Sequence, residues 1–371
     1  MTPGKELQGI NVVSIDQAVA APYCSLLLAD AGARVIKVER PEGDFARGYD
    51  RGANGNSVIF AWLNRGKESI SVDLNQQQDV ALLHKMLSTA DVFVHNLAPG
   101  ALAKRGFSGD ALRADNPGLI SCEISGYGNQ GSAASKKAYD FLVQAESGLC
   151  SVTGTDDSPS RVGISICDIS SGLTAFSAIL RALIGRGITG EGSDIAISMF
   201  DVMADWMNMP LLSSRYMGGA PGRLGLTHAL IAPYGAFECG CGSQILIAIQ
   251  SNREWAIFCD QVLKQAELGQ DIRFKDNTDR VANRPALHAI VNDTFSRYDQ
   301  SQLVALLDRA KIANARLSDV DDLSSHEFLN NITIQFGDMS IELADLPVPG
   351  ARPVEVPLLN QHGDAIRLEY S

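Results

Sequence analysis

Short runs rich in β-branched residues alternate with longer helical patterns through the first half of the chain, and this alternation limits the possible folds more than any other feature. The strand-like runs lie at residues 10–15, 34–38, 69–73, 92–95, 119–124 and 195–199. Strands that alternate with helices form βαβ units, whose consecutive strands run parallel. The sequence therefore predicts an α/β fold with a Rossmann-like, mostly parallel sheet.

The pattern changes near residue 200, which indicates a second, smaller domain in a chain of 371 residues. Residues 214–228 are glycine-rich and aperiodic, and a hairpin followed by three helical patterns comes after them. The expected division is a large domain at residues 1–200, a linker at 201–225, a small α/β domain at 226–325 and a tail at 326–371 that returns to the large domain.

An excess of acidic residues argues against nucleic acid as a partner. The chain has 31 Lys and Arg against 43 Asp and Glu, a formal net charge of −12, which repels a polyphosphate. No apolar run approaches the roughly 18 residues that span a membrane, and the first residues do not read as a signal peptide. Seven scattered cysteines favour reduced thiols. We expect a cytoplasmic protein that binds neither nucleic acid nor membrane.

One stretch, Gly126-Tyr-Gly-Asn-Gln-Gly131, has the letters of a dinucleotide-binding motif and follows a strand. A nicotinamide site requires that this motif open a helix at once. Here a polar segment, residues 132–137, comes next, and the first strand of the chain is followed by different residues altogether. The context therefore argues against a nicotinamide cofactor.

Other common cofactor and catalytic motifs are missing from the sequence. Gly66-Lys67 is followed by Glu68 and lacks the earlier glycine of a P-loop at the required spacing, and Cys239 and Cys241 lack a second pair at zinc spacing. The six histidines form no recognisable dyad with a serine or cysteine. We expect no metal site and no hydrolase chemistry of the serine or cysteine type.

Asp168 ends an apolar run and stands where a long helix, residues 169–186, is expected to begin. A carboxylate at that position can cap the helix by accepting hydrogen bonds from the first-turn N–H groups. The same geometry points a carboxylate at the sheet edge where ligands of α/β proteins bind. Both interpretations stay open on the residues alone.

Basic residues recur near the expected strand-to-helix turns of this acidic chain. Such a rim is where a phosphate-bearing ligand of an α/β protein would lie, although each lysine could equally be a solvated surface charge. These residues are Lys37, Arg40, Lys67, Lys104, Arg105, Lys136 and Lys137.

Seven motifs resemble those of a known family and occur in that family's order over residues 8–205. They begin with Ala20-Ala-Pro-Tyr, Ala31-Gly-Ala-Arg, Leu63-Asn-Arg-Gly, Asp91-Val-Phe-Val, Ile124-Ser-Gly-Tyr, Tyr139-Asp-Phe-Leu and Cys167-Asp. The chain resembles the class III CoA-transferases of the CaiB/BaiF type, and most closely their dicarboxylate-specific members, such as the mesaconyl-CoA, itaconate and citramalate enzymes.

The resemblance implies a reaction, a binding site and an assembly. Asp168 would attack an acyl-CoA and carry CoA as an aspartyl thioester, so coenzyme A would be a substrate and no cofactor would be held permanently. A small carboxylic acid would be the other substrate, and two chains would form an interlocked homodimer. The implied CoA contacts are Ala18, Val19, Arg40, Lys67, Asn96, Leu97, Lys104, Arg105, Lys137 and Tyr139.

The resemblance also distinguishes transfer from racemisation. The related 2-methylacyl-CoA racemases use a His-Asp pair where this chain has Tyr139-Asp140, so one of the two bases of a proton transfer is missing. CoA transfer is therefore favoured, with a racemase or isomerase of the same fold as the alternative. Asp140 matches a position that is acidic in transferases too. Gly225 and His228 match the family's oxyanion loop in position only. A CoA-binding protein without activity is a third hypothesis.

The substrate is expected to be a C4–C5 dicarboxylate, such as mesaconate, itaconate, citramalate, malate or succinate, because two segments near residues 201 and 223 resemble members that act on these acids. Transfer of CoA between the C1 and C4 carboxyls of mesaconyl-CoA is a special case of the same chemistry. The second carboxylate of such a substrate requires a cation to bind it, and the candidates are Arg47, Arg51 and Arg223.

Overall fold

The computed structural model describes residues 4–371, and this chain divides into two compact units. The first holds the residues up to 150, residues 161–211 and residues 330–371; the second holds residues 151–160 and 212–329. Residues 151–160 thus belong to the second unit, although the sequence placed them in the large domain. The expected linker at 201–225 is largely helical, because α8 (Met199–Trp206) and α9 (Asn208–Tyr216) occupy much of it.

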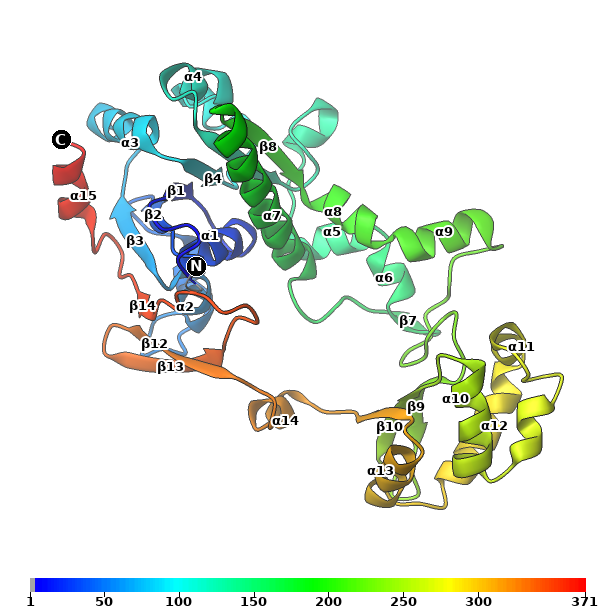
Figure 1. Cartoon of the computed structure of the whole chain (residues 1–371). Coiled ribbons are helices and arrows are strands. Elements are labelled where there is room, and N and C mark those ends of the chain that lie inside the picture. The colour runs from blue at the N-terminus through cyan, green and yellow to red at the C-terminus, as the bar shows by residue number, and fades with distance from the viewer. Residues whose placement is uncertain (1–3) are drawn as a thin grey trace. The chain divides into compact units, whose positions relative to one another are not determined.

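A six-stranded parallel sheet in the order β3-β2-β1-β4-β5-β8 forms the centre of the first unit, which confirms the predicted α/β class (Figure 1). The strand order reverses between β1 and β4, and ligands of open α/β sheets bind outside the carboxyl ends of the strands at such a reversal. The strands are β1 (Asn11–Ile15), β2 (Arg34–Glu39), β3 (Lys67–Ser71), β4 (Val92–His95), β5 (Ile120–Ser125) and β8 (Ser193–Ser198).

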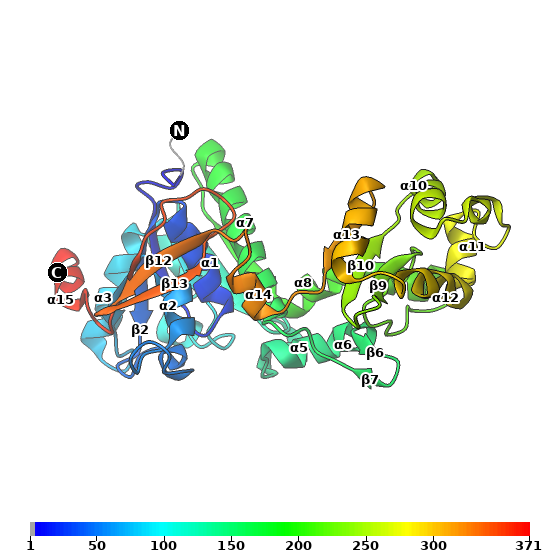
Figure 2. The same cartoon turned by 90° about the horizontal axis from the view of Figure 1, so that it is seen from below.

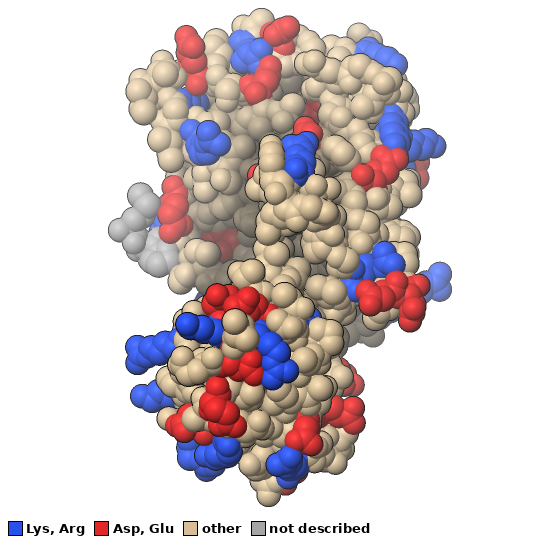
Figure 3. Space-filling model, turned by 90° about the vertical axis from the view of Figure 1, so that its right-hand side faces the viewer, with Lys and Arg blue, Asp and Glu red and all other residues tan. Residues whose placement is uncertain are grey.

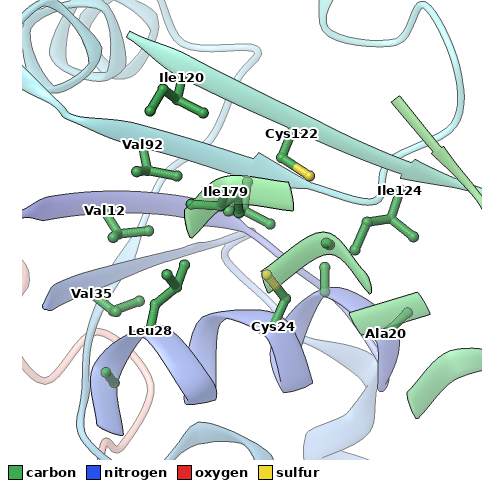
Figure 4. Packing of buried hydrophobic residues seen from close by; sticks show 14 of the residues in the cluster. Val12, Ala20, Cys24, Leu28, Val35, Val92, Ile120, Cys122, Ile124 and Ile179 are labelled. Atoms are coloured by element: carbon green, nitrogen blue, oxygen red, sulfur yellow. The ribbon is translucent and has the colours of Figure 1, made fainter. Parts of the chain in front are cut away.

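One face of this sheet is covered by α1 (Ala20–Asp30) and α7 (Ile166–Thr189). Figure 4 shows valine and isoleucine side chains of the strands meeting Cys24 and Leu28 of α1 and Ile179 of α7. The two helices approach closely at Gly172, where an added Cβ would lie 2.4 Å from the carbonyl oxygen of Ala20. Only glycine allows this packing.

The α7 helix begins at Ile166, three residues earlier than predicted, and continues to Thr189. By length and composition alone it is apolar enough to cross a membrane. It packs instead on α1, β5 and β8, so its buried side is part of the core of the first unit. Its other side carries exposed apolar residues.

The other face of the sheet packs against α3 (Gln77–Thr89) and α4 (Gly109–Asp115), whose apolar side chains join those of the strands. The tail, residues 330–371, adds a small sheet of β12 (Asn331–Phe336), β13 (Met339–Ala344) and β14 (Glu355–Val356), and then α15 (Gly363–Glu369). In Figure 2 the β12–β13 hairpin, in orange, lies beside α2 (Val58–Asn64). Phe60 of α2 stacks on Phe336 of β12, with 6.0 Å between ring centroids.

The second unit is built on an antiparallel sheet in the order β11-β10-β9, which confirms the predicted hairpin at 234–238 and 244–248. Its core is largely aromatic and aliphatic, with Trp255, Phe258 and Phe295 packed together. Its elements are β6 (Gly154–Thr155), β7 (Ser158–Pro159), β9 (Tyr234–Glu238), β10 (Gln244–Ala248), α10 (Asn252–Ile257), α11 (Asn277–Ala282), α12 (Arg284–Phe295), α13 (Gln300–Arg309), β11 (Ala313–Arg316) and α14 (Val320–Ser324).

A buried network of charges links the carboxyl ends of β1 and β2 to Lys67, the first residue of β3. The Lys37 ammonium contacts Asp16 at 2.5 Å and Asp44 at 2.9 Å, and Lys67 contacts Asp16 at 3.2 Å. The side chains of Lys37, Lys67 and Asp16 have no exposed surface. Such a network is costly to break, because the loss of one partner leaves an unpaired charge in the interior.

On the surface, basic and acidic residues are interspersed over the face that Figure 3 shows, with no extended basic stripe on it. On that face, therefore, no separate positive region offsets the net charge of −12.

We predict that Lys37→Met lowers the free energy of unfolding by about 3–5 kcal/mol, because Asp16 and Asp44 then stay buried with too little compensating charge. Lys85→Met, at an exposed position of α3, is the matched control and should change stability by less than about 0.5 kcal/mol. Urea unfolding followed by circular dichroism measures both. Equal stability of the two variants would contradict the structural importance of the network.

Candidate active site

The segment after β1 lies at the reversal of strand order and is held in an unusual conformation. Gln17 donates its N–H to the side chain of Asn96 at 2.9 Å, and the Asn96 amide donates back to the Gln17 carbonyl at 2.8 Å. Ala18 has a φ of 61°, a left-handed conformation that is rare for any residue other than glycine. Strained backbone of this kind gathers at functional sites.

A cavity of about 700 Å³ opens beside this segment, and all the residues that line it belong to the first unit. It brings together eight residues that the sequence analysis selected: Ala18, Val19, Asn96, Leu97, Lys137, Tyr139, Asp140 and Asp168. Among its other lining residues are Gln17, Phe45, Tyr49, Ser165, Met199 and Arg161. The cavity is large enough for a drug-sized ligand.

Asp168 is the third residue of α7 and not its N-cap, so the capping interpretation of Asp168 is wrong. Asp140, at the start of α5 (Asp140–Glu146), caps α7 instead. Its Oδ1 accepts hydrogen bonds from the N–H groups of Cys167 at 2.7 Å and Asp168 at 3.2 Å. Since another residue satisfies these donors, the Asp168 side chain is left to line the cavity.

The environment of Asp168 makes its carboxyl group unusually basic. Burial raises its pKa, and the nearby Asp140 carboxylate raises it further, to about 7. Both causes disfavour the charged form. A carboxyl group of this kind is present in its protonated and ionised forms together near neutral pH, which is a common property of catalytic groups.

Gln144 of α5 fixes the geometry around Asp140. This buried side chain donates from Nε2 to Asp140 Oδ2 at 2.6 Å, and its Oε1 accepts from the Val162 N–H at 2.9 Å. The segment that leads into α7 is therefore tied to α5 beside the cavity. Sequence analysis missed Gln144, although its spacing of four residues from Asp140 on one helix was an available signal.

A second cavity, of about 350 Å³, lies at the carboxyl ends of β1 and β2 and contains Arg40. It shares Gln17 and Leu97 with the first cavity. Lys104 and Arg105 are exposed outside both cavities. The Arg105 guanidinium nevertheless bonds the Leu74 carbonyl and the Asn75 side chain, which line the second cavity.

Several predicted binding residues have structural roles instead. Lys67 is buried and donates to Asp16, to Asn64 at 2.9 Å and to the Pro22 carbonyl at 3.1 Å, so it cannot contact a ligand in the cavity. Arg47 is held by Glu39 through two hydrogen bonds of 2.8 and 2.7 Å. These two expectations are corrected, because buried acidic partners engage both cations.

The residues predicted for the oxyanion loop belong to the second unit. Arg223 donates to the carbonyl oxygens of Thr155 and Asp156, each at 2.8 Å. Gly225 has a φ of 55°, and the His228 ring stacks on Tyr234 with 5.0 Å between centroids. None of the three lines either cavity of the first unit. Over residues 4–371, no three His, Cys, Asp or Glu side chains gather as metal ligands would.

Comparison with known proteins gives a consistent result. The sequence pattern of CoA-transferase family III matches residues 7–355. The acetyl-CoA:oxalate CoA-transferase of Acetobacter aceti is 33% identical over 100% of this chain and 98% of that protein. The succinyl-CoA:mesaconate CoA-transferase of Haloarcula hispanica is 30% identical over 96% of this chain and 94% of its own. A CaiB/BaiF family protein from Brucella suis superposes with a TM-score of 0.85, at 31% identity and full coverage of both chains.

We predict that Asp168→Asn stabilises the protein in a pH-dependent way. The pKa of Asp168 is about 7 in the folded chain and 3.8 without the fold, so ionising it destabilises the folded state. Above about pH 7 the variant should gain on the order of 1–2 kcal/mol, a value discounted for solvent screening.

The gain should shrink as the pH falls and vanish below about pH 4, where the wild-type carboxyl is protonated in the folded and the unfolded state alike. Urea unfolding at a series of pH values measures it. Asp115→Asn, at an exposed position of α4, is the control and should show no such dependence. A constant difference between Asp168→Asn and wild type across this range would refute the assigned environment.

Proposed function

This chain belongs to CoA-transferase family III, and we propose that it moves CoA between an acyl-CoA and a carboxylic acid through an aspartyl-CoA thioester on Asp168. One observation carries the proposal: Asp168 lines a large cavity in the first turn of α7 while Asp140 does the capping. A side chain released from a structural duty is available as a nucleophile.

Each proposed step exchanges one activated bond, a thioester or an anhydride, for another. The Asp168 carboxylate attacks the thioester carbonyl, the C–S bond breaks, and a mixed anhydride and CoA thiolate form. The thiolate then attacks the aspartyl carbonyl and releases the first acid, which leaves CoA on Asp168. The incoming acid repeats these steps in reverse. Because CoA stays bound, each attack is effectively intramolecular.

The two cavities suit the two ends of CoA. Arg40, with Lys104 and Arg105 nearby, supplies cations for the nucleotide phosphates. The shared residues Gln17 and Leu97 would let the pantetheine arm continue toward Asp168. Along that arm we place Ala18, Val19, Asn96, Lys137 and Tyr139. Gly225 and His228 of the second unit remain proposed oxyanion groups.

We propose a dicarboxylic acid as the acyl group or acceptor. The relatives from Acetobacter aceti and Haloarcula hispanica are named for oxalate and for mesaconate, both dicarboxylates. Intramolecular transfer on mesaconyl-CoA remains a special case, which needs no separate acceptor.

The decisive experiment is mass spectrometry of the Asp168 peptide after mixing with succinyl-CoA, with and without hydroxylamine. We expect a CoA thioester on Asp168, or its hydroxamate, which one or more of mesaconate, itaconate, citramalate, malate, glutarate and oxalate discharges. Asp168→Ala should abolish the adduct and lower transfer by at least about 10³-fold, since a nucleophile is lost. Asp115→Ala, at an exposed position of α4, should leave both unchanged.

Other outcomes identify the alternatives. Solvent deuterium at the α-carbon of the acyl group, with no acceptor acid present, would establish a racemase or isomerase instead. Binding of CoA without any adduct or transfer would establish a protein that only binds CoA.

We also propose a homodimer in which the second chain covers the exposed side of α7. Ile184 and Ile188 of this helix are 68% and 83% exposed, and Trp206 of α8 is 52% exposed. Ile184 and Ile188 stand one turn apart on α7, and neighbouring exposed apolar side chains of this kind mark an interaction surface. Identical chains most often pair with twofold symmetry.

Replacing both Ile184 and Ile188 by Glu should therefore shift the chain from a dimer toward a monomer, because buried charges oppose association. Light scattering coupled to gel filtration measures the mass. Ile272→Glu, in the second unit and 83% exposed, is the control and should stay dimeric. A wild-type chain that is monomeric at micromolar concentration would exclude this arrangement.

A further inference from the structure

Arg161 enters the Asp168 cavity from the segment that leads into α7. It lines that cavity together with Ser165 and Asp168. Its Nε donates to the Val162 carbonyl at 3.1 Å, and its guanidinium carbon lies 5.5 Å from the centre of the Phe141 ring. A guanidinium presents its N–H donors in a planar fork whose geometry matches a carboxylate.

The backbone beside Arg161 is anchored to the same frame that positions Asp168. The Val162 N–H bonds Gln144, Gln144 bonds Asp140, and Asp140 bonds the N–H groups of the first turn of α7. The backbone next to Arg161 and the first turn of α7 are therefore joined by one set of hydrogen bonds. Two recognition groups held on one frame suit a ligand with two functional groups.

The other basic residues of this cavity suit the role less well. Lys136 contacts the Glu146 carboxylate and lies 4.5 Å from the Tyr127 ring centre. Lys137 is proposed above for CoA. None of the three arginines that the sequence suggested, Arg47, Arg51 and Arg223, is among the residues that line this cavity. Sequence analysis did not select Arg161, because it lies in an aperiodic loop.

We propose that Arg161 binds the far carboxylate of a dicarboxylic acid while the near carboxylate reacts at Asp168. The proposal rests on the proposed CoA transfer and identifies the residue that selects dicarboxylates over monocarboxylates. Arg161 forms no covalent bond: it contributes a paired, charge-assisted hydrogen bond that a methyl group in the same place cannot accept.

The test compares acids that differ only at the far end: succinate with butyrate, and glutarate with valerate. With acetyl-CoA as donor, Arg161→Gln should lower kcat/KM for succinate and glutarate by about 10- to 100-fold. It should change kcat/KM for butyrate and valerate by less than about 3-fold. Arg161→Lys keeps the charge without the fork and should fall between wild type and Arg161→Gln.

Two further measurements keep folding and selectivity apart. Formation of the Asp168 adduct from acetyl-CoA has no far carboxylate, so it should proceed in Arg161→Gln at close to the wild-type rate. Arg253→Gln, at an exposed position of α10 in the second unit, is the matched control and should alter nothing.

The remaining outcomes overturn the proposal in distinguishable ways. An equal loss for both kinds of acid, or no loss for either, would show that Arg161 does not select dicarboxylates. A wild-type enzyme that transfers CoA to butyrate as well as to succinate would overturn it while the proposed function stands. A wild-type enzyme that forms no Asp168 adduct and transfers CoA to no acid would overturn both.

Discussion

The buried charges of Asp16, Lys37, Asp44 and Lys67 are the constraint on which the rest of the first unit depends. They join the carboxyl ends of β1 and β2 to the start of β3, and Asp44 also accepts the Ala18 N–H at 3.3 Å. The left-handed conformation of Ala18, and with it one wall of the cavity, is thus maintained by ion pairs beneath it. Because removal of one member leaves its partners charged in the interior, the network tolerates few arrangements.

At Asp168, burial and a neighbouring carboxylate determine the pKa of the carboxyl group. The Asp140 carboxylate stabilises the first turn of α7 by accepting two N–H groups, and the same negative charge helps raise the pKa of its neighbour. One residue therefore stabilises a helix and makes a second residue costly to ionise. A site that is destabilised locally in this way depends on a rigid surrounding structure. The hydrogen bonds of Gln144 to Asp140 and Val162 contribute to that structure.

The sequence predicted what depends on local pattern and missed what depends on distant partners. The strand at 92–95 and the hairpin of the second unit match the structure residue for residue, because period and turn residues specify them. Asp168 was found through its place after an apolar run. Its capping role was wrong, since the true cap lies 28 residues earlier on another helix. Lys67 was misassigned for the same reason: its carboxylate partner, Asp16, is 51 residues away.

Because the tail is the last part of the chain to be synthesised, the first unit is completed after the second. Residues 330–371 belong to this unit although the whole second unit precedes them in the chain. The tail contacts the rest of the first unit at two places. The His362 N–H donates to the Ser69 carbonyl of β3 at 2.9 Å, and the Arg367 guanidinium donates to Asp79 at 2.7 Å. During synthesis, every residue of the cavity leaves the ribosome before the edge strand β3 gains these contacts. The second unit is synthesised in full before the tail and can fold while the first unit still lacks its last residues.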